Sequence, residues 1–534
     1  MKHLAAMDLS HLASRSPRRR NFPGRNLNDM ACHGQSQPDE ALHIIMEGGL
    51  FGGYPYYYGS FVVATTAAMR ASVIIALFGL VALALGQPGH NGADRPGPPG
   101  PPGPHVPKPD PVAVCRAERL HNVTKGISQP RGVNLGNWFV LEAWMNQTVW
   151  TLGNCSTDTY RGSYQVEQCL KSKGLRQTVM EQWWSSAITE ADFAKMSASG
   201  INLVRLPVGW WSIYDIFGNT SVAPFNNTFD GQDYQSGSLK YIDKAFQWGH
   251  QYGIAILLEM HAAPGSQNGD DHSAPGDHSG NHYWDGYVNN QDATVDSIRL
   301  YAQRYGKHPA LWGFGLLNEP KGDHFALQRY YAIAYSIIRQ FSHHSNIVLN
   351  PLIAPFEFGV EGWWVPFMKD NYYTNIWLDL HLYSCFGGPA DQPWSGGAIG
   401  YVNWDRYWQI KAVKDANPTK KVIVGEWSAG NNFGDDNIVG FTNAQLKTYG
   451  TGDGFTFWNW NGNYNAWNFQ YLLAAGIDKS LLSTQIQILL HNLLRKPPFV
   501  FTLIYVRATE LENENPTGRK QIENPDNRQQ VDEE

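Results

Sequence analysis

Cysteine is scarce in this sequence, with 5 among 534 residues, and basic residues form no block in its central part. So few cysteines exclude a scaffold built on disulfides, and no cysteine–histidine spacing matches a zinc motif. The formal net charge is -6, which does not favour a polyanionic partner. We therefore expect no nucleic-acid partner, no metal and no cofactor, and a neutral substrate fits better.

A long apolar run is also missing. The most apolar stretch, ASVIIALFGLVALAL at 71–85, follows Met69 and Arg70 and is short of the about 20 residues that span a bilayer. This layout predicts a signal peptide at 69–86, with Met69 as the working start and 1–68 as an unstructured upstream segment. The alternative is a signal anchor with 1–68 in the cytoplasm, as in a single-pass type II membrane protein. Both interpretations place the rest of the chain outside the cell.

The remaining chain divides by composition. Residues 87–111 are a Pro/Gly linker, 112–495 have the patterning of one folded domain, and 496–534 form a polar tail. We expect the N-terminal region and the tail to be disordered. Export agrees with five glycosylation sequons, at Asn122, Asn146, Asn154, Asn219 and Asn226.

Four cysteines follow the predicted signal segment. Cys155 and Cys169 are close in sequence within a polar stretch, which predicts a disulfide. Cys115 and Cys385 could pair only if the N-terminal arm crossed the mouth of the fold.

Apolar runs alternate with helical stretches from Arg131 onward, the pattern of a parallel α/β sheet. Two helices are expected at 187–199 and 238–252, and a last one at 481–494. Eight such runs predict a closed (β/α)₈ TIM barrel with its site at the C-terminal ends of the strands. The expected strands are 131–136, 202–209, 254–261, 311–319, 346–352, 375–383, 421–428 and 454–460.

Two glutamates stand at such strand ends, Glu319 after LWGFGLLN and Glu426 after KVIVG. Paired carboxyl groups are what cleavage of a glycosidic bond requires. The sequence also holds 20 Trp, and flat aromatic faces suit the C–H faces of sugars. These observations predict a glycosidase.

Seven motifs in order extend this prediction: RGVNLGNWFVLE (131–142), NLVRLPVGWW (202–211), MHAAPGSQNG (260–269), LLNEP (316–320), LHLYSCF (380–386), VGEWS (424–428) and FWNWNG (457–462). With them, residues 131–477 resemble family 5 glycoside hydrolases, and among these the fungal exo-β-1,3-glucanases (glucan 1,3-β-glucosidases). The resemblance implies a retaining enzyme that releases glucose from the non-reducing ends of β-1,3-glucan in cell-wall metabolism. It makes Glu319 the acid/base and Glu426 the nucleophile. The substrate-binding residues that it implies are Glu142, Arg205, His261, Asn318, His381, Tyr383, Phe386 and Trp458.

Chemistry suggests roles for several of these residues. Arg205 and Tyr383 can hydrogen-bond Glu426 and keep it ionised, and Asn318 can bind the sugar 2-hydroxyl. His261 and His381 would hold the acid/base and sugar hydroxyls. By resemblance, Glu142 and Trp458 line the terminal glucose, and Phe386 clamps sugars at the entrance, with Trp284 as a loose match for the other half. We interpret the three histidines of the Gly/Asp-rich loop as solvated: His272, His278 and His282.

The chain departs from the family pattern at Asn137, which stands where a second glycine is usual, and in a short insertion between the sixth and seventh strands. This leaves an endo-acting β-1,6-glucanase or cellulase as alternatives. A non-catalytic glucan-binding wall protein is a further alternative, although binding alone requires no pair of glutamates. We expect a secreted monomer.

Overall fold

The computed structural model describes residues 110–217, 233–277, 279–353, 363–386, 397–432 and 437–482. The expected segments 1–68, 69–86 and 496–534, nearly all of the linker 87–111, and most of the helix expected at 481–494 lie outside the described residues. So do the sequons at Asn219 and Asn226 and the loop residue His278.

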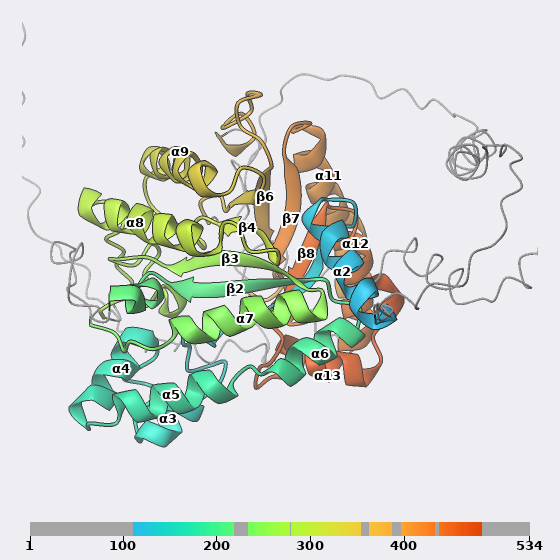
Figure 1. The fold of residues 1–534 in the computed structure, drawn as a ribbon. Coiled ribbons are helices and arrows are strands. Elements are labelled where there is room, and N and C mark those ends of the chain that lie inside the picture. Colours follow the sequence, from blue (N-terminus) through green and yellow to red (C-terminus); the bar gives the residue numbers. More distant parts are fainter. Residues whose placement is uncertain are drawn as a thin grey trace, which may run out of the picture. The chain divides into compact units, whose positions relative to one another are not determined.

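Eight parallel strands form a closed barrel in which each strand pairs with its sequence neighbours and β8 pairs with β1 (Figure 1). The predicted (β/α)₈ fold is confirmed, and all eight expected strands are present. Every residue of β2 and β3 is buried, as near-continuous apolar runs require in a parallel sheet covered on both faces. The strands are β1 Arg131–Asn134, β2 Leu203–Gly209, β3 Ala255–Ala262, β4 Leu311–Gly315, β5 Asn346–Leu349, β6 Ile376–His381, β7 Lys421–Glu426 and β8 Gly454–Phe457.

Helices between the strands cover the outside of the barrel (Figure 1). Those expected at 187–199 and 238–252 correspond to α6 and α7. Helix α7 buries one face through Ile242, Ala245 and Phe246 and ends at Gly253, whose φ of +67° suits a glycine C-cap. The α-helices after β1 are α6 Glu190–Ala198, α7 Leu239–Tyr252, α8 Val288–Tyr305, α9 His324–Phe341, α10 Gly397–Tyr401, α11 Tyr407–Asp415, α12 Ile438–Tyr449 and α13 Phe469–Ala475, with α3 to α5 described below. Short 3₁₀ helices are η3 Ser212–Phe217, η5 Asp271–Ser273, η9 Asn465–Trp467 and η10 Lys479–Leu482, and η8 Val402–Arg406 is a π-helical segment between α10 and α11.

Three helices between β1 and α6 were not expected from the sequence: α3 Thr148–Gly153, α4 Ser163–Ser172 and α5 Arg176–Ser186. They pack on one another beside the barrel (Figure 1). The predicted disulfide joins Cys155, just after α3, to Cys169 in α4, so it ties two of these helices together.

Helix α2, Pro111–Thr124, lies at the N-terminal end of the barrel, where Arg119 Nε donates to the carbonyl of Gly253 over 3.0 Å. Cys115 belongs to this helix, whereas Cys385 follows the C-terminal end of β6. Among the described residues neither is part of a disulfide, and the arm lies at the opposite end of the barrel from its mouth. Within the described ranges, no helix is both long enough and apolar enough to cross a membrane.

Candidate active site

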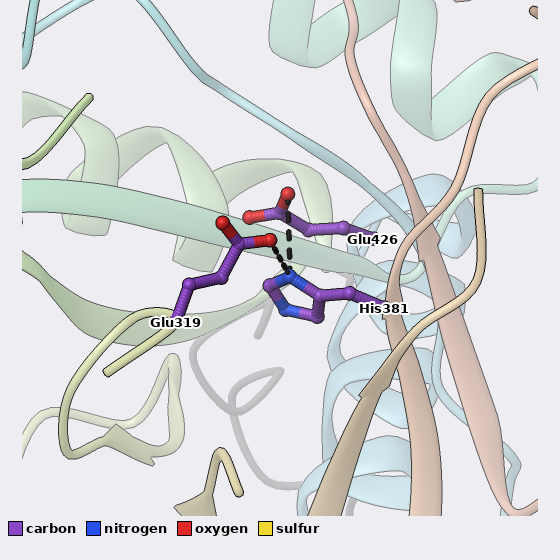
Figure 2. A group of neighbouring side chains, drawn as sticks. All are labelled: Glu319, His381 and Glu426. Carbon is purple, nitrogen blue, oxygen red and sulfur yellow. Dashed lines mark hydrogen bonds and ion pairs between the residues drawn. The ribbon is translucent and has the colours of Figure 1, made fainter. Parts of the chain in front are cut away.

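Glu319 and Glu426 approach each other at the C-terminal ends of β4 and β7, with His381 of β6 between them (Figure 2). One carboxylate oxygen of each glutamate and a ring nitrogen of His381 all lie within 4.8 Å of one another. His381 Nδ1 is 2.5 Å from Glu319 Oε1 and 3.5 Å from Glu426 Oε2. The barrel thus brings together two carboxyl groups that are 107 positions apart in sequence (426 − 319).

Glu426 receives two strong hydrogen bonds. Arg205 Nη1 lies 2.6 Å from its Oε1, and the Tyr383 hydroxyl donates to its Oε2 over 2.8 Å. Burial opposes the charge of Arg205, but the neighbouring carboxylates, Glu259 first, outweigh it and raise the pKa of Arg205. A permanent cation and a phenol therefore face the two oxygens of Glu426 and hold its side chain in place.

The guanidinium of Arg205 also fixes two amides. Its Nη1 donates to Asn134 Oδ1 over 2.9 Å and its Nη2 to Asn318 Oδ1 over 2.7 Å. Because the Asn318 oxygen is occupied by Arg205, its NH₂ group is the part left for a sugar hydroxyl.

Glu319 occupies a left-handed backbone conformation, with φ of +43°, which is uncommon for a residue other than glycine. Its N–H donates to Asn350 Oδ1 over 2.8 Å, and its carbonyl accepts from Asn268 Nδ2 over 3.1 Å. Two side chains from neighbouring elements thus hold the backbone turn that directs the Glu319 carboxyl toward Glu426.

Two imidazoles contact the Glu319 carboxyl: His381 at Oε1, and His272 of η5 at Oε2 over 3.2 Å. Burial alone would raise the pKa of Glu319. With both imidazoles protonated, their hydrogen bonds and charges outweigh burial and hold this pKa well below its usual range. The interpretation of His272 as a solvated loop residue is therefore wrong, because its ring lies against the acid/base candidate. His282, in contrast, pairs with Asp285 over 3.1 Å, away from these glutamates.

Two further buried carboxyl groups escaped the sequence interpretation, Glu259 and Asp379. Glu259 lies 3.3 Å from Arg205 and 2.9 Å from His261, and Asp379 accepts from the Gly425 N–H over 2.8 Å. Burial raises the pKa of Glu259 to about 7, against the opposing effect of Arg205. Each stands two residues before a predicted site histidine on the same strand, and side chains at that spacing share a face of the sheet. This periodicity could have found both.

His261 does not contact the acid/base candidate. Its Nδ1 faces Glu259, and its ring stacks on Trp458 with 5.3 Å between ring centres. Burial lowers the pKa of His261 well below its usual value, so the ring is neutral. Its Nε2 is buried and has no hydrogen-bond partner, which leaves that atom for a ligand. Gly136 allows Trp458 this position, because a Cβ there would lie 2.7 Å from the indole.

Glu142 lies near the same group of side chains. Trp144 Nε1 donates to its Oε2 over 2.8 Å, and burial raises the pKa of Glu142 to about 7. The departure at Asn137 has a local explanation. Asn137 has φ of +61°, which glycine and asparagine tolerate best, and its Oδ1 accepts from the Glu142 N–H over 2.6 Å.

Phe386 is 61% exposed and packs on Tyr383 and Trp467, with ring centres 5.1 and 5.8 Å away. Its exposed aromatic face suits an entrance residue. Trp284 does not fit the second half of a clamp. It is 1% exposed and donates its N–H to Thr294 Oγ1 over 2.9 Å, so it is a core residue.

A family match over more than half of the chain establishes which family this protein belongs to. The profile of cellulase (glycosyl hydrolase family 5) matches residues 167–464. The chain belongs to glycosyl hydrolase family 5. It is therefore a glycoside hydrolase, and the family resemblance is confirmed.

Individual relatives agree with this assignment. The chain is 27% identical over 417 residues to the glucan 1,3-beta-glucosidase of Schwanniomyces occidentalis, which covers 68% of this chain and 91% of the relative. It is 30% identical over 353 residues to that of Candida oleophila, covering 63% and 72%. Its fold is similar to the crystal structure of rutinosidase from Aspergillus niger, with a TM-score of 0.53 at 17% identity over 66% of this chain and 98% of that one.

Proposed function

We propose that this family 5 enzyme is a retaining exo-β-1,3-glucanase that releases glucose from the non-reducing ends of β-1,3-glucan. The observation that carries the mechanism is the approach of Glu319 and Glu426, because one carboxyl oxygen of each lies within 4.8 Å of the other. Retaining glycosidases hold their carboxyl groups about 5–5.5 Å apart, whereas inverting ones need about 6.5–9.5 Å to admit a water. The short separation supports retention.

In the first step, a Glu426 oxygen attacks the anomeric carbon while Glu319 gives its proton to the glycosidic oxygen. The bond from the anomeric carbon to that oxygen breaks, and a glucosyl ester forms on Glu426. Arg205 and Tyr383 hold the attacking carboxylate in place through its two oxygens, so little reorganisation is needed at the moment of reaction.

In the second step, Glu319 acts as a base. It takes a proton from a water that attacks the anomeric carbon, the ester bond breaks, and glucose leaves with its original configuration. Asn318, whose amide is oriented by Arg205, binds the 2-hydroxyl through its NH₂ group. His261 Nε2, Glu142 and Trp458 surround the terminal glucose, and Phe386 supports the next sugar.

The β-1,3 linkage and the exo mode rest on the glucan 1,3-beta-glucosidase relatives. The alternative of a cellulase is supported by the description of the matching family as cellulase. Product analysis tests the choice: laminarin and carboxymethyl cellulose are incubated with the enzyme and the products are separated at early times. We expect glucose alone from laminarin. Laminari-oligosaccharides without early glucose would contradict the exo mode, cello-oligosaccharides would favour the cellulase, and no product would favour a glucan-binding protein.

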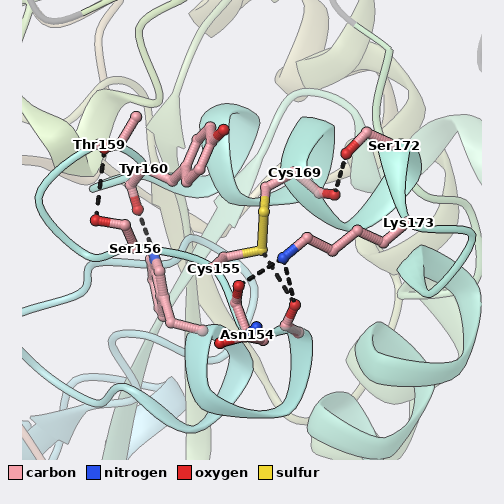
Figure 3. The surroundings of a disulfide bond; sticks show 10 residues. Asn154, Cys155, Ser156, Thr159, Tyr160, Cys169, Ser172 and Lys173 are labelled. Atoms are coloured by element: carbon pink, nitrogen blue, oxygen red, sulfur yellow. Dashed lines mark hydrogen bonds between the residues drawn. A yellow bond between two sulfur atoms is a disulfide. The ribbon is translucent and has the colours of Figure 1, made fainter.

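Action outside the cell, on a glucan wall and as a monomer, belongs to the same proposal. The Cys155–Cys169 disulfide supports the location outside the cell (Figure 3), because stable disulfides are usual in oxidising compartments. Asn154, beside that disulfide, is an exposed sequon residue. Digestion with an endoglycosidase should lower the apparent mass of the secreted protein.

A further inference from the structure

The geometry points to His272 as a positioning residue that keeps the catalytic proton on Glu319: we propose that neutral His272 accepts a hydrogen bond from the protonated carboxyl through Nε2. This inference rests on the proposed acid/base role of Glu319. His272 does not exchange the proton in this proposal. It orients the acid by accepting from Oε2.

The side-chain amide of Asn268 determines which atom donates the hydrogen bond between His272 and Glu319. Its Oδ1 accepts from the Asp270 N–H over 2.9 Å, and its Nδ2 donates to the Glu319 carbonyl over 3.1 Å. Turning the amide over would place NH₂ against an N–H and oxygen against a carbonyl. The two backbone contacts therefore fix the orientation of the amide.

In that orientation, Asn268 Nδ2 lies 2.8 Å from His272 Nε2. Two N–H donors cannot face each other at this distance, so Nε2 carries no hydrogen and the ring proton is on Nδ1. The same Nε2 is 3.2 Å from Glu319 Oε2. A carboxylate there would face a lone pair, whereas a protonated carboxyl can donate to it. The proton shared by this pair therefore belongs to Glu319.

The other oxygen of Glu319 fits this assignment. His381 Nδ1 lies 2.5 Å from Oε1. Burial lowers the pKa of His381, but the charges of Glu426 and Asp379, the two largest opposing effects, raise it, so His381 is a donor. Oε1 then accepts from His381, while Oε2–H and the Asn268 NH₂ group share the lone pair of His272 Nε2, at 3.2 Å and 2.8 Å.

Both charge states must be weighed at His272. Burial lowers the pKa of His272, whereas the hydrogen bond and charge of an ionised Glu319, together with Glu142 and Asp270, would outweigh burial and raise this pKa to about 10. That ion pair would place a protonated Nε2 against the Asn268 NH₂ group, 2.8 Å away. The other titratable groups nearby are Glu142 and Asp270 beside His272, and Glu426 and Glu259 beside Glu319.

The alkaline limb of kcat/KM reports loss of the Glu319 proton in the free enzyme. It tests whether Glu319 donates to a neutral His272 or accepts from a protonated one. Removing a neutral acceptor in His272→Ala should move this limb to lower pH by about half to one unit. Removing a positive charge would move it to higher pH. His272→Gln supplies a neutral acceptor at the reach of Nε2 and should restore the limb. His282→Asn, in the same loop but paired with Asp285, is the matched control and should leave the profile unchanged.

The limb is measured on laminaribiose and on an activated aryl β-glucoside. The loss in kcat/KM for His272→Ala should be larger for laminaribiose, because its poor leaving group needs the acid. An upward shift, or no shift, in His272→Ala would overturn the proposal. If wild-type enzyme fails to hydrolyse either glucoside, the proposed function fails instead, so the two failures are distinguishable.

Nitrogen-15 NMR of histidine-labelled enzyme gives a second readout that does not depend on the variants' activity. The His272 signals are assigned by their disappearance in His272→Gln. At pH 6 we expect a protonated Nδ1 and an unprotonated Nε2. Two protonated nitrogens would refute the assignment.

Discussion

Glu319 and Glu426 have the same side chain but different partners, and the partners separate their roles. Glu426 faces a guanidinium and a phenol, which stabilise a carboxylate. Glu319 faces two imidazoles and lies on a left-handed turn held by Asn350 and Asn268. One is therefore suited to attack and the other to proton transfer.

Replacing the nucleophile tests the first role. In Glu426→Gln, turnover of laminarin should fall by several orders of magnitude because the amide cannot form the ester. Glucan binding and the melting temperature should change little, since the amide oxygen can still accept from Arg205. Glu118→Gln, at an exposed position, is the control. Near-normal turnover in Glu426→Gln would refute the role.

Azide rescue tests the second role. Glu319→Ala should still form the glucosyl-enzyme from an activated aryl glucoside, whose leaving group needs no acid, but should hydrolyse it slowly. Added azide should restore turnover and yield β-glucosyl azide, identified by proton NMR. Glu426→Ala is the matched control, and it should give no β-azide. An α-azide from Glu319→Ala would contradict retention.

At this scale the sequence predicts residues that occur in motifs and misses those defined by contacts. Glu319 and Glu426 end apolar runs, so their strand-end positions were predictable. His272 lies in an irregular Gly/Asp-rich loop, and its approach to Glu319 depends on how η5 folds against β3. Trp284 shows the opposite error, because sequence likeness alone does not reveal that an aromatic side chain is buried.

At the scale of elements, continuous apolar runs predicted all eight strands because both faces of a parallel barrel sheet are buried. Helices α3 to α5 were missed, since the polar stretch that contains them has no comparable run. Their packing depends on one another and on a disulfide. Glu259 and Asp379 were missed for another reason. Each is a single charged residue within an otherwise apolar strand, close to the site.

The disulfide should contribute measurably to this helical unit. Cys155 and Cys169 are separated by 14 positions, and closing a loop of about 15 residues contributes about 3 kcal/mol in the chain-entropy model. The double variant Cys155→Ala/Cys169→Ala should therefore unfold at lower denaturant concentration. Lys173 still donates to the carbonyls of Gly153 and Asn154 (Figure 3), so the double variant should lose stability but still fold. Cys115→Ser, at a free and exposed cysteine, should have no effect, and an unchanged midpoint in the double variant would contradict the prediction.

At the scale of the whole molecule, the barrel buries several carboxyl groups outside the reacting pair. Besides Glu142 and Glu259, burial raises the pKa of Glu167 in α4 to about 8, against the hydrogen bond that its Oε2 accepts from the Gln235 N–H over 2.6 Å. Glu167 lies in the helical unit beside the barrel, so its titration can be examined without touching catalysis. Its pKa is raised in the folded state, which fixes the sign of its effect on stability.

A glutamate with a raised folded pKa stabilises the fold fully below its ordinary pKa of 4.5, and this stability is lost as pH rises through about 8. Glu167→Gln removes the titration and keeps an oxygen that can accept from Gln235. From pH 5 to pH 8, the free energy of unfolding of the wild type should therefore fall relative to that of Glu167→Gln, by an amount on the order of a few kcal/mol. Denaturant unfolding of both proteins at the two pH values measures this difference, with Glu118→Gln as the exposed control. A constant difference would show that the Glu167 carboxyl titrates alike in the folded and unfolded chains, and a change of opposite sign would mean that its ionised form is the one the fold stabilises.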